Sequence, residues 1–372
     1  MDDRSGGSIR ILVVAGARPN FMKVAPLLRQ LRARRCFAPI LVHTGQHYDA
    51  AMSDAFFRDL GMPEPDVNLG VGSGSHAAQT AEVLRQIEPV LIERKPHAVV
   101  VVGDVNSTLA ATLAAVKLGV PVAHVEAGLR SFDRSMPEEI NRILTDAVST
   151  WLFTSEPAGA ENLRREGVAP ERIHFVGNVM IDTLRTHLER ALEAAPLAAL
   201  GLDPGSYAVL TLHRPSNVDD PRRLLRLFEV LESIHEQIPV VFPVHPRTRA
   251  AIQTQLEGRT PKLAIVEPLG YLEFLGLTAR AKVVLTDSGG IQEETTALGV
   301  PCLTLRSSTE RPVTVDEGTN VLVGSEPDAI RAALQRVLDG SARRGRVPAL
   351  WDGNAAGRIA EILERELATA PG

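Results

Sequence analysis

Three carboxylates in the first half of this chain stand at points where they can transfer protons. Asp104 comes shortly after the apolar run at residues 98–102, and Glu126 directly follows the segment at residues 121–125. Glu138 lies in MPEEINR, at the expected start of a helix. A glutamate is seldom buried without a partner, so the recurrence of such acids predicts an acid/base set.

Each acid also has a simpler structural explanation. A lone aspartate after a strand most often caps the next helix, and proline followed by acids suits the first turn of a helix. Arg142 lies four residues after Glu138, about one helical turn away. We therefore expect the guanidinium of Arg142 to orient Glu138 and keep it ionised.

The second half contains residues suited to holding an anion. In TDSGGIQEE, Ser288, Gly289 and Gly290 form a turn between a strand and a helix, where backbone N–H groups can approach a diphosphate. Glu294, one turn further on, is placed to accept hydrogen bonds from ribose hydroxyls. An ordinary helix cap with a glycine turn is the less favoured explanation.

Further cationic or donor residues follow other expected strands. His213 in LHRP can donate to a phosphate or move a proton, and Arg311 in STERP can join the same anion site. Arg18 and Lys23 in GARPNFMK open the first helix, where a ligand and a solvated helix start are equally good explanations. That segment is not GxGxxG, which disfavours a dinucleotide cofactor, and no spacing of histidines or cysteines predicts a metal site.

Strands and helices alternate along the chain in two series. This order predicts an α/β fold of two Rossmann-like, doubly wound domains, one at residues 8–180 and one at residues 181–353, with a last helix at 354–367 packing back on the first domain. Strands are expected at residues 9–15, 40–43, 98–102, 121–125, 151–154, 174–176, 207–212, 240–244, 263–266, 282–286 and 302–305. Ligands of such sheets bind beyond the carboxyl ends of the strands, which is where the candidate residues lie.

Composition narrows the class of protein. The chain has 372 residues and a formal net charge of -5, a poor match to non-specific binding of nucleic acid or membranes. Its N-terminus lacks the apolar core of a signal peptide, so we expect a cytoplasmic protein. The cysteines, Cys36 and Cys302, are far apart and are expected to be reduced and buried.

Taken together, these segments resemble the bacterial non-hydrolysing UDP-N-acetylglucosamine 2-epimerases. The matching motifs run in order over nearly the whole chain: GARPNFMK, TGQH, GDVNST, HVEAGLRS, MPEEINR, VGNVMID, LHRP, PVHP, TDSGGIQEE and STERP. The resemblance implies a glycosyltransferase-B-like fold with the active site in a cleft between the domains. It also implies a homodimer that interconverts UDP-GlcNAc and UDP-ManNAc without a cofactor.

The resemblance assigns roles to individual positions. Asp104, Glu126 and Glu138 would be the acid/base carboxylates, with His213 as a further catalytic residue. Phe274 would lie by the uracil, and a regulatory UDP-GlcNAc site would include Gln46 and His47. The remaining substrate-binding positions would be Arg18, Lys23, Ser288, Gly289, Gly290, Glu294 and Arg311.

The sequence departs from the family in two places. Pro215, Ser216 and Asn217 follow the His-Arg pair where many relatives have a second arginine and a glutamate, which leaves open whether the regulatory site is kept. Leu269 stands where many relatives have glutamine, which leaves open the uracil contacts and the sugar accepted.

The chemistry favours elimination. The hydrogen on C2 of the sugar has no adjacent carbonyl, so it becomes acidic only as UDP leaves C1. Elimination to 2-acetamidoglucal followed by re-addition inverts C2 without redox chemistry. A glycosyltransferase of the same fold, a hydrolysing epimerase, a UDP-sugar 2-epimerase for another substituent and an inactive nucleotide-sugar sensor are the alternatives.

Overall fold

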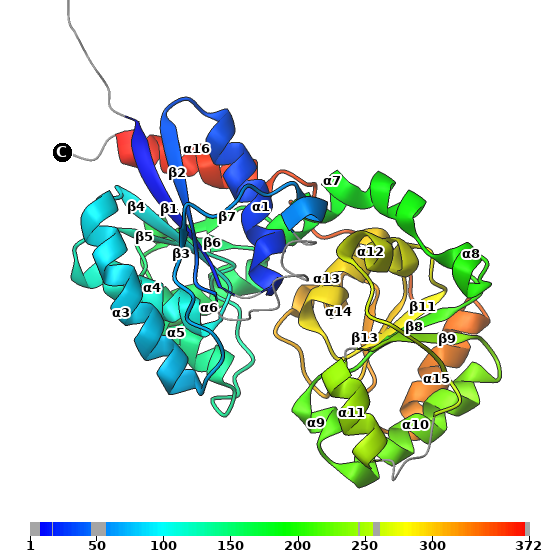
Figure 1. Ribbon diagram of the computed structural model, residues 1–372. Helices are drawn as coiled ribbons and strands as arrows, with labels where there is room; N and C mark the ends of the chain where they lie inside the picture. The colour runs from blue at the N-terminus through cyan, green and yellow to red at the C-terminus, as the bar shows by residue number, and fades with distance from the viewer. Residues whose placement is uncertain (1–7, 17, 46–56, 245, 256–260, 369–372) are drawn as a thin grey trace, which may run out of the picture. The chain divides into compact units, whose positions relative to one another are not determined.

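The computed structural model describes residues 8–16, 18–45, 57–244, 246–255 and 261–368 (Figure 1). Contacts within the chain divide it into two compact units. The N-terminal unit comprises Met1–Arg185 and Ala349–Gly372, and the C-terminal unit comprises Thr186–Pro348. The boundary expected from the sequence, between residues 180 and 181, falls slightly earlier, inside helix α7 (Val179–Ala194).

The N-terminal unit is built on a seven-stranded parallel sheet with the order β3-β2-β1-β4-β5-β6-β7. Its central strand β4 reads AVVVV and is buried along its whole length, as expected for a parallel sheet covered on both faces. The strands are β1 (Ile9–Ala15), β2 (Phe37–His43), β3 (Val67–Asn68), β4 (Ala98–Val102), β5 (Val122–Val125), β6 (Trp151–Thr154) and β7 (Ile173–Phe175).

Helices connect these strands. The last helix returns to this unit and packs against the first one, and Trp351 just before it donates its indole N–H to the Ser155 carbonyl at 2.9 Å. The helices are α1 (Arg18–Ala33), α3 (His76–Arg94), α4 (Asn106–Lys117), α5 (Pro137–Val148), α6 (Pro157–Arg165), the 3-10 turn η1 (Pro170–Arg172), α7 (Val179–Ala194) and α16 (Ala355–Ala368).

The C-terminal unit has a six-stranded parallel sheet with the order β10-β9-β8-β11-β12-β13. Its strands are β8 (Ala208–Thr211), β9 (Val240–Pro243), β10 (Ala264–Val266), β11 (Val283–Thr286), β12 (Cys302–Thr304) and β13 (Asn320–Leu322). Its helices are α8 (Leu197–Leu200), α9 (Pro215–Val218), α10 (Pro221–His235), α11 (Pro246–Gln255), α12 (Tyr271–Ala279), α13 (Gly289–Leu298), α14 (Pro312–Asp316) and α15 (Pro327–Leu338).

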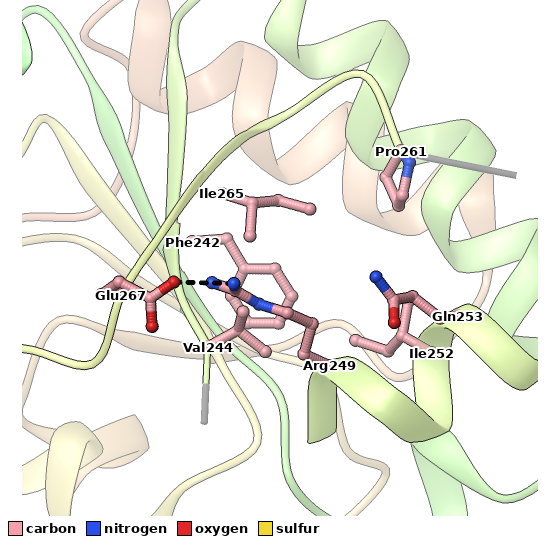
Figure 2. A pocket seen from close by; sticks show the side chains of 8 residues that line it. All are labelled: Phe242, Val244, Arg249, Ile252, Gln253, Pro261, Ile265 and Glu267. Atoms are coloured by element: carbon pink, nitrogen blue, oxygen red, sulfur yellow. Dashed lines mark hydrogen bonds and ion pairs between the residues drawn. The ribbon is translucent and has the colours of Figure 1, made fainter. Parts of the chain in front are cut away.

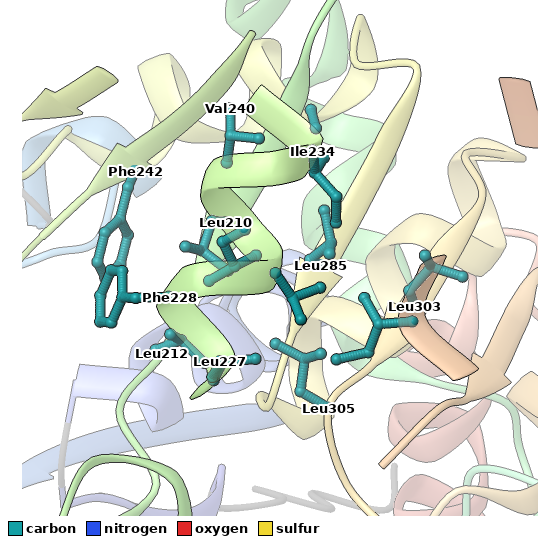
Figure 3. Packing of buried hydrophobic residues seen from close by; sticks show 14 of the residues in the cluster. Leu210, Leu212, Leu227, Phe228, Ile234, Val240, Phe242, Leu285, Leu303 and Leu305 are labelled. Atoms are coloured by element: carbon teal, nitrogen blue, oxygen red, sulfur yellow. The ribbon is translucent and has the colours of Figure 1, made fainter. Parts of the chain in front are cut away.

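Apolar packing fixes the helices on this second sheet. Figure 3 shows helix α10 laid along the strands, with Leu227, Phe228 and Ile234 beside Leu210 and Leu285. All five side chains are fully buried or nearly so, and burial of each stabilises the fold by about 1.5–3 kcal/mol. The sheet is thereby a rigid support for the loops at its edge.

Both sheets share one topology. When the strands are numbered within each unit, both sheets contain the order 3-2-1-4-5-6. The strand order reverses between the first and fourth strands, which are neighbours in the sheet. Ligands bind at this reversal point in doubly wound folds. The loops that follow β1, β4, β8 and β11 lie at these points, and Asp104, His213 and Ser288 are on them.

The predicted α/β fold with two doubly wound sheets is confirmed. Six short elements of the described residues were not predicted: β3, β13, α6, η1, α9 and α14. None exceeds nine residues, too short for hydrophobic periodicity to indicate them. Within the described ranges, no helix is long and apolar enough to cross a membrane.

Candidate active site

Asp104 is held by an arginine from a neighbouring helix. It follows strand β4, and its carboxylate accepts a hydrogen bond at 2.5 Å from Nη1 of Arg142 on α5. Arg142 also donates through Nε and Nη2 to Oε2 of Glu139, at 3.0 and 2.7 Å. The Asp104 side chain keeps 29% of its surface exposed, whereas Glu139 and Arg142 are buried. Asp104 is therefore the member of this group that a ligand can reach.

Two sequence-based expectations about this group were wrong. The N-cap of α4 is Val105, without a side-chain cap bond, so Asp104 does not take the capping role. Among the ion pairs of the described ranges, Arg142 pairs with Asp104 and Glu139, not with Glu138. The cause is the turn before α5, where Ser131 and Phe132 donate backbone N–H groups to Glu139 and draw it inward. Glu138 stays half-buried in the first turn of α5.

Glu139 is the ionised anchor of this arrangement. Burial alone would raise the pKa of its carboxyl, but the backbone N–H donors and Arg142 hold that pKa below its usual value. A buried carboxylate with these donors fixes the guanidinium of Arg142 in one orientation. Arg142 in turn fixes Asp104.

Glu126 forms a second acid centre with a lysine. Its carboxylate pairs with the ammonium of Lys23 on α1, and both side chains are almost entirely buried. Glu126 has a φ of 73°, a left-handed conformation rare for residues other than glycine and costing about 1–3 kcal/mol. Gly103 lies against the pair: a Cβ there would come within 3.3 Å of both Glu126 Oε2 and Lys23 Nζ. The loops after β4 and β5 thus meet at this ion pair.

A buried histidine on β5 connects the loop after β4 to helix α5. His124 on β5 places Nε2 2.8 Å from the Gly103 carbonyl and Nδ1 2.6 Å from Asp146 on α5. Asp146 also pairs with Arg130 at 2.8 Å. Burial alone would raise the pKa of Asp146, but His124 and Arg130 hold it below its usual value.

Three candidates of the first half fall wholly or in part outside the described residues. Gln46 and His47 lie outside the described residues. Arg18 is the first residue of α1, and its side chain likewise falls outside the description.

In the C-terminal unit, the loop after β8 is tied to the loop after β11. His213 is half-exposed and its Nδ1 lies 2.8 Å from Oδ1 of the fully buried Asp287. Asp287 also accepts the backbone N–H of Arg214 at 2.9 Å and the side-chain amide of Asn217 at 3.2 Å. Burial would raise the pKa of Asp287, but His213 and the backbone donors hold it below its usual value.

The side chain of Arg311 packs against Gly289 of the TDSGGIQEE motif. Helix α13 begins at Gly289, so Gly289 and Gly290 form its first turn and Ser288 is the N-cap, without a side-chain cap bond. A Cβ at Gly289 would come within 2.7 Å of Nη1 of Arg311. Arg311 therefore lies on the N-terminus of the helix, where its charge adds to that of the helix dipole. Its Nε is 2.8 Å from Oε1 of the buried Glu293, which fixes its position.

Glu294 differs from its neighbour Glu293 in charge. Burial, with the nearby negative charge of Glu293, raises the pKa of Glu294 to about 8. At neutral pH the Glu294 carboxyl is then mostly protonated, so it can both donate and accept a hydrogen bond. Phe274 on α12 is partly buried and packs against the core of this unit.

A separate pocket lies between α11 and strands β9 and β10 (Figure 2). It measures about 250 Å³, and an ion pair of 2.7 Å between Arg249 and Glu267 lies at its wall. It is lined by Phe242, Val244, Arg249, Ile252, Gln253, Pro261, Ile265 and Glu267. None of the residues selected from the sequence is among them.

Comparison with known proteins decides the family. The family model described as UDP-N-acetylglucosamine 2-epimerase matches residues 29–364. A UDP-N-acetylglucosamine 2-epimerase of Methanococcus maripaludis is 42% identical over 364 residues, which cover 95% of this chain and 98% of that protein. The chain belongs to the UDP-N-acetylglucosamine 2-epimerase family.

Two further relatives of this epimerase bear on its fold and substrate. The crystal structure of the Methanocaldococcus jannaschii UDP-GlcNAc 2-epimerase, in complex with UDP-GlcNAc and UDP, has a TM-score of 0.88 and 41% identity, covering 96% of this chain and 100% of that one. The UDP-2,3-diacetamido-2,3-dideoxy-D-glucuronate 2-epimerase of Pseudomonas aeruginosa is 43% identical over 96% of this chain and 100% of its own. The chain is thus a UDP-sugar 2-epimerase, an isomerase, and the alternatives of a glycosyltransferase and an inactive sensor are set aside.

Sequence reasoning missed the residues that hold the candidates in place. Glu139, Asp146, Asp287 and Glu293 are all buried acids, each bonded to a residue of the epimerase that the sequence did suggest or to its loop. Glu139, Asp287 and Glu293 are each next to a candidate in the same motif, and that adjacency is the signal that could have indicated them. Asp146 lies outside every quoted motif and has no such local signal.

Proposed function

We propose that this epimerase interconverts UDP-GlcNAc and UDP-ManNAc by eliminating UDP and adding it back. In the first step the bond from C1 to the phosphate oxygen breaks and its electron pair leaves with UDP. The proton on C2 passes to a carboxylate, and the C1–C2 double bond of 2-acetamidoglucal forms. In the second step the UDP oxygen adds to C1 while C2 receives a proton on its other face.

The N-terminal unit supports the proton-transfer part of the proposal. Removing a proton from one face of C2 and delivering one to the other face requires two groups. Asp104 and Glu126 are the primary pair in this proposal, and Glu138 is a third acid. The carrying observation is the fixed and partly exposed Asp104 carboxylate, whose 2.5 Å bond to Arg142 holds it in one orientation.

The C-terminal unit supports the leaving-group part. UDP departs as an anion, so donors placed where its charge develops lower the barrier. Arg311 on the N-terminus of α13, the N–H groups at Gly289 and Gly290, and His213 are suited to this role. Arg18 and Lys23 are further substrate-binding residues of the proposal, and Glu294 would bind the ribose and Phe274 the uracil.

A second candidate substrate is UDP-2,3-diacetamido-2,3-dideoxy-glucuronate. The 43% identity to the Pseudomonas aeruginosa enzyme favours it as much as the 42% relative favours UDP-GlcNAc. The two sugars share the C2 acetamido group and the leaving group, so the same elimination serves both. They differ in a second acetamido group and a carboxylate.

The experiment compares the two sugars directly. Purified protein is incubated with each UDP-sugar in D₂O, and proton and phosphorus NMR follow the products over time. We expect UDP-ManNAc from UDP-GlcNAc, with deuterium at C2 and no free sugar. If only the diacetamido sugar is turned over, that sugar is the substrate and UDP-GlcNAc is not. Release of free ManNAc would indicate a hydrolysing enzyme.

We also propose that the protein forms a homodimer through helix α5. The polar residues of this helix are buried except for the half-buried Glu138, whereas its exposed residues Ile140, Leu144, Ala147 and Val148 are all apolar. We call Ile140, Leu144 and Val148 the α5 stripe; they follow one another every four residues and are 41–46% exposed. An uncharged stripe on a helix can pack against its own copy across a two-fold axis, which supports a second copy of this chain as the partner.

A further inference from the structure

The fully buried Asp287 connects the two loops at the reversal point of the C-terminal sheet. It follows β11, and its carboxylate accepts bonds from three groups of the loop after β8: the backbone N–H of Arg214, the side-chain amide of Asn217 and Nδ1 of His213. The backbone N–H of His213 lies 3.1 Å from the same carboxylate. Because β8 and β11 are adjacent parallel strands, this bridge is short and rigid.

The bridge determines which nitrogen of His213 is free. A carboxylate can only accept, so the Nδ1 atom at 2.8 Å must carry a proton. The other ring nitrogen, Nε2, is then the one that a ligand can meet, and the half-exposed ring gives access to it.

We infer that Asp287 is a positioning residue for the epimerisation: it fixes the orientation and tautomer of His213 so that Nε2 faces the departing diphosphate. This inference rests on the proposed function, in which His213 stabilises the leaving UDP. With Nδ1–H bound to Asp287, Nε2 donates to the diphosphate when the ring also carries a proton on that nitrogen. Asp287 itself does not touch the substrate.

A purely structural role predicts something different. If Asp287 only held the loop, its loss would disturb Arg214 and Asn217 as much as His213, and the effect would not depend on the imidazole. If Asp287 acts through His213, its effect disappears once the imidazole is gone. A double-mutant cycle separates these cases.

The variants are Asp287→Asn, His213→Gln and the double variant. Asparagine keeps the shape and one acceptor oxygen, so the loop retains most of its hydrogen bonds. We expect Asp287→Asn alone to lower kcat about 10- to 100-fold, as for loss of a charged hydrogen bond, with KM changed less than about 3-fold. In the His213→Gln background the same change should alter kcat less than about 3-fold. An equal loss in both backgrounds would overturn the inference.

Nitrogen NMR of the wild type and of Asp287→Asn keeps the test decisive if His213→Gln has too little activity. Nitrogen NMR of histidine-labelled protein, with the His213 signal assigned by its loss in His213→Gln, reports which ring nitrogen is protonated. We expect a protonated Nδ1 in the wild type and a shift to the Nε2–H tautomer in Asp287→Asn. An unprotonated Nδ1 in the wild type contradicts the inference.

The controls separate this inference from the proposed reaction. Asp220 caps helix α10 in the same unit, by accepting the backbone N–H groups of Arg222 and Arg223, and Asp220→Asn should leave kcat unchanged. If wild-type protein fails to epimerise either UDP-sugar, the proposed reaction is wrong, although the tautomer can still be read by NMR. If wild type epimerises but the cycle shows no coupling, the inference about Asp287 fails alone.

Discussion

Arg142 donates to the Asp104 carboxylate at 2.5 Å while its other nitrogens hold Glu139, so one guanidinium joins the loop after β4 to the start of α5. The orientation of Asp104 is therefore set by a helix that follows it by more than thirty residues in the sequence. A partly exposed aspartate is thereby held in one orientation, as the proposed proton transfer requires.

The first prediction concerns Asp104. Asp104→Asn keeps the shape and the contact with Arg142 but removes the proton-accepting oxygen. We expect exchange of the C2 hydrogen with solvent deuterium to fall by at least about 100-fold, because proton transfer needs a base. UDP binding, measured by calorimetry, should change little.

Asp133 provides the matched control, since it lies in an exposed turn of the same unit and its side chain accepts hydrogen bonds from the nearby Ser135. Asp133→Asn should exchange at the wild-type rate. Exchange at that rate in Asp104→Asn would remove Asp104 from the mechanism and leave Glu126 or Glu138 as the base.

The second prediction concerns the buried pair of Lys23 and Glu126. Lys23→Met removes the cation that pairs with the buried carboxylate of Glu126. We expect the free energy of unfolding to fall by about 3–5 kcal/mol, as for other broken buried pairs. The double variant Lys23→Met with Glu126→Gln should recover part of this loss in urea unfolding. With Glu126→Gln measured alone, a double variant whose loss equals the sum of the two single losses would show that the pair is not coupled.

Sequence reasoning located the loops because they have a local signature. A run such as Ala98–Val102 can only be a buried strand, and the polar residue that follows it must then lie at the edge of the sheet. The glycine at 289 likewise indicates a close approach, which in the structure is that of Arg311. These inferences depend on a few neighbouring residues.

The partners of those residues depend on the packing of distant segments. Arg142 is four residues from Glu138 and three from Glu139, and both spacings put the side chains on one face of a helix. Only the turn at Ser131 and Phe132, which captures Glu139, decides between them. The contact of Asp287 with His213 similarly requires β8 and β11 to be adjacent, which the sequence does not state.

The third prediction concerns pH and Glu294, whose pKa burial raises to about 8 from an ordinary value of 4.5. Since the folded protein binds this proton more tightly than the unfolded chain does, Glu294 lowers stability as pH rises from about 4.5 to 8. Glu294→Gln mimics the protonated form and escapes this loss. Relative to wild type, we therefore expect the variant to gain stability with rising pH, measured by urea unfolding at pH 5, 6, 7 and 8.

A charged control checks the assignment. Glu273 lies in the first turn of helix α12 in the same unit, where it accepts the backbone N–H of Gly270, and Glu273→Gln provides the matched change of a carboxyl to an amide. A difference between Glu294→Gln and wild type that is constant with pH would mean that Glu294 is ionised throughout.

The fourth prediction concerns the α5 stripe. Leu144→Glu places a charge in the middle of the proposed dimer contact, where a buried charge without a partner is strongly unfavourable. We expect the variant to be monomeric by sedimentation at concentrations where wild type is dimeric. Leu225→Glu, at an exposed leucine of the C-terminal unit with 38% of its surface accessible, should leave the dimer intact. A monomeric wild type would rule out the homodimer.

The last prediction concerns Gly128, which ends the HVEAGLR loop beside Glu126. Gly128 has a φ of +79°, and an added Cβ would come within 2.3 Å of the Gly159 carbonyl oxygen. Gly167 has a similar φ of +85° but open space around its Cα. Alanine at Gly167 therefore suffers the left-handed strain alone, about 1–2 kcal/mol, whereas alanine at Gly128 adds a backbone clash of about 1–3 kcal/mol. Urea unfolding should show a clearly larger loss for Gly128→Ala, and equal losses would mean that α6 yields without cost.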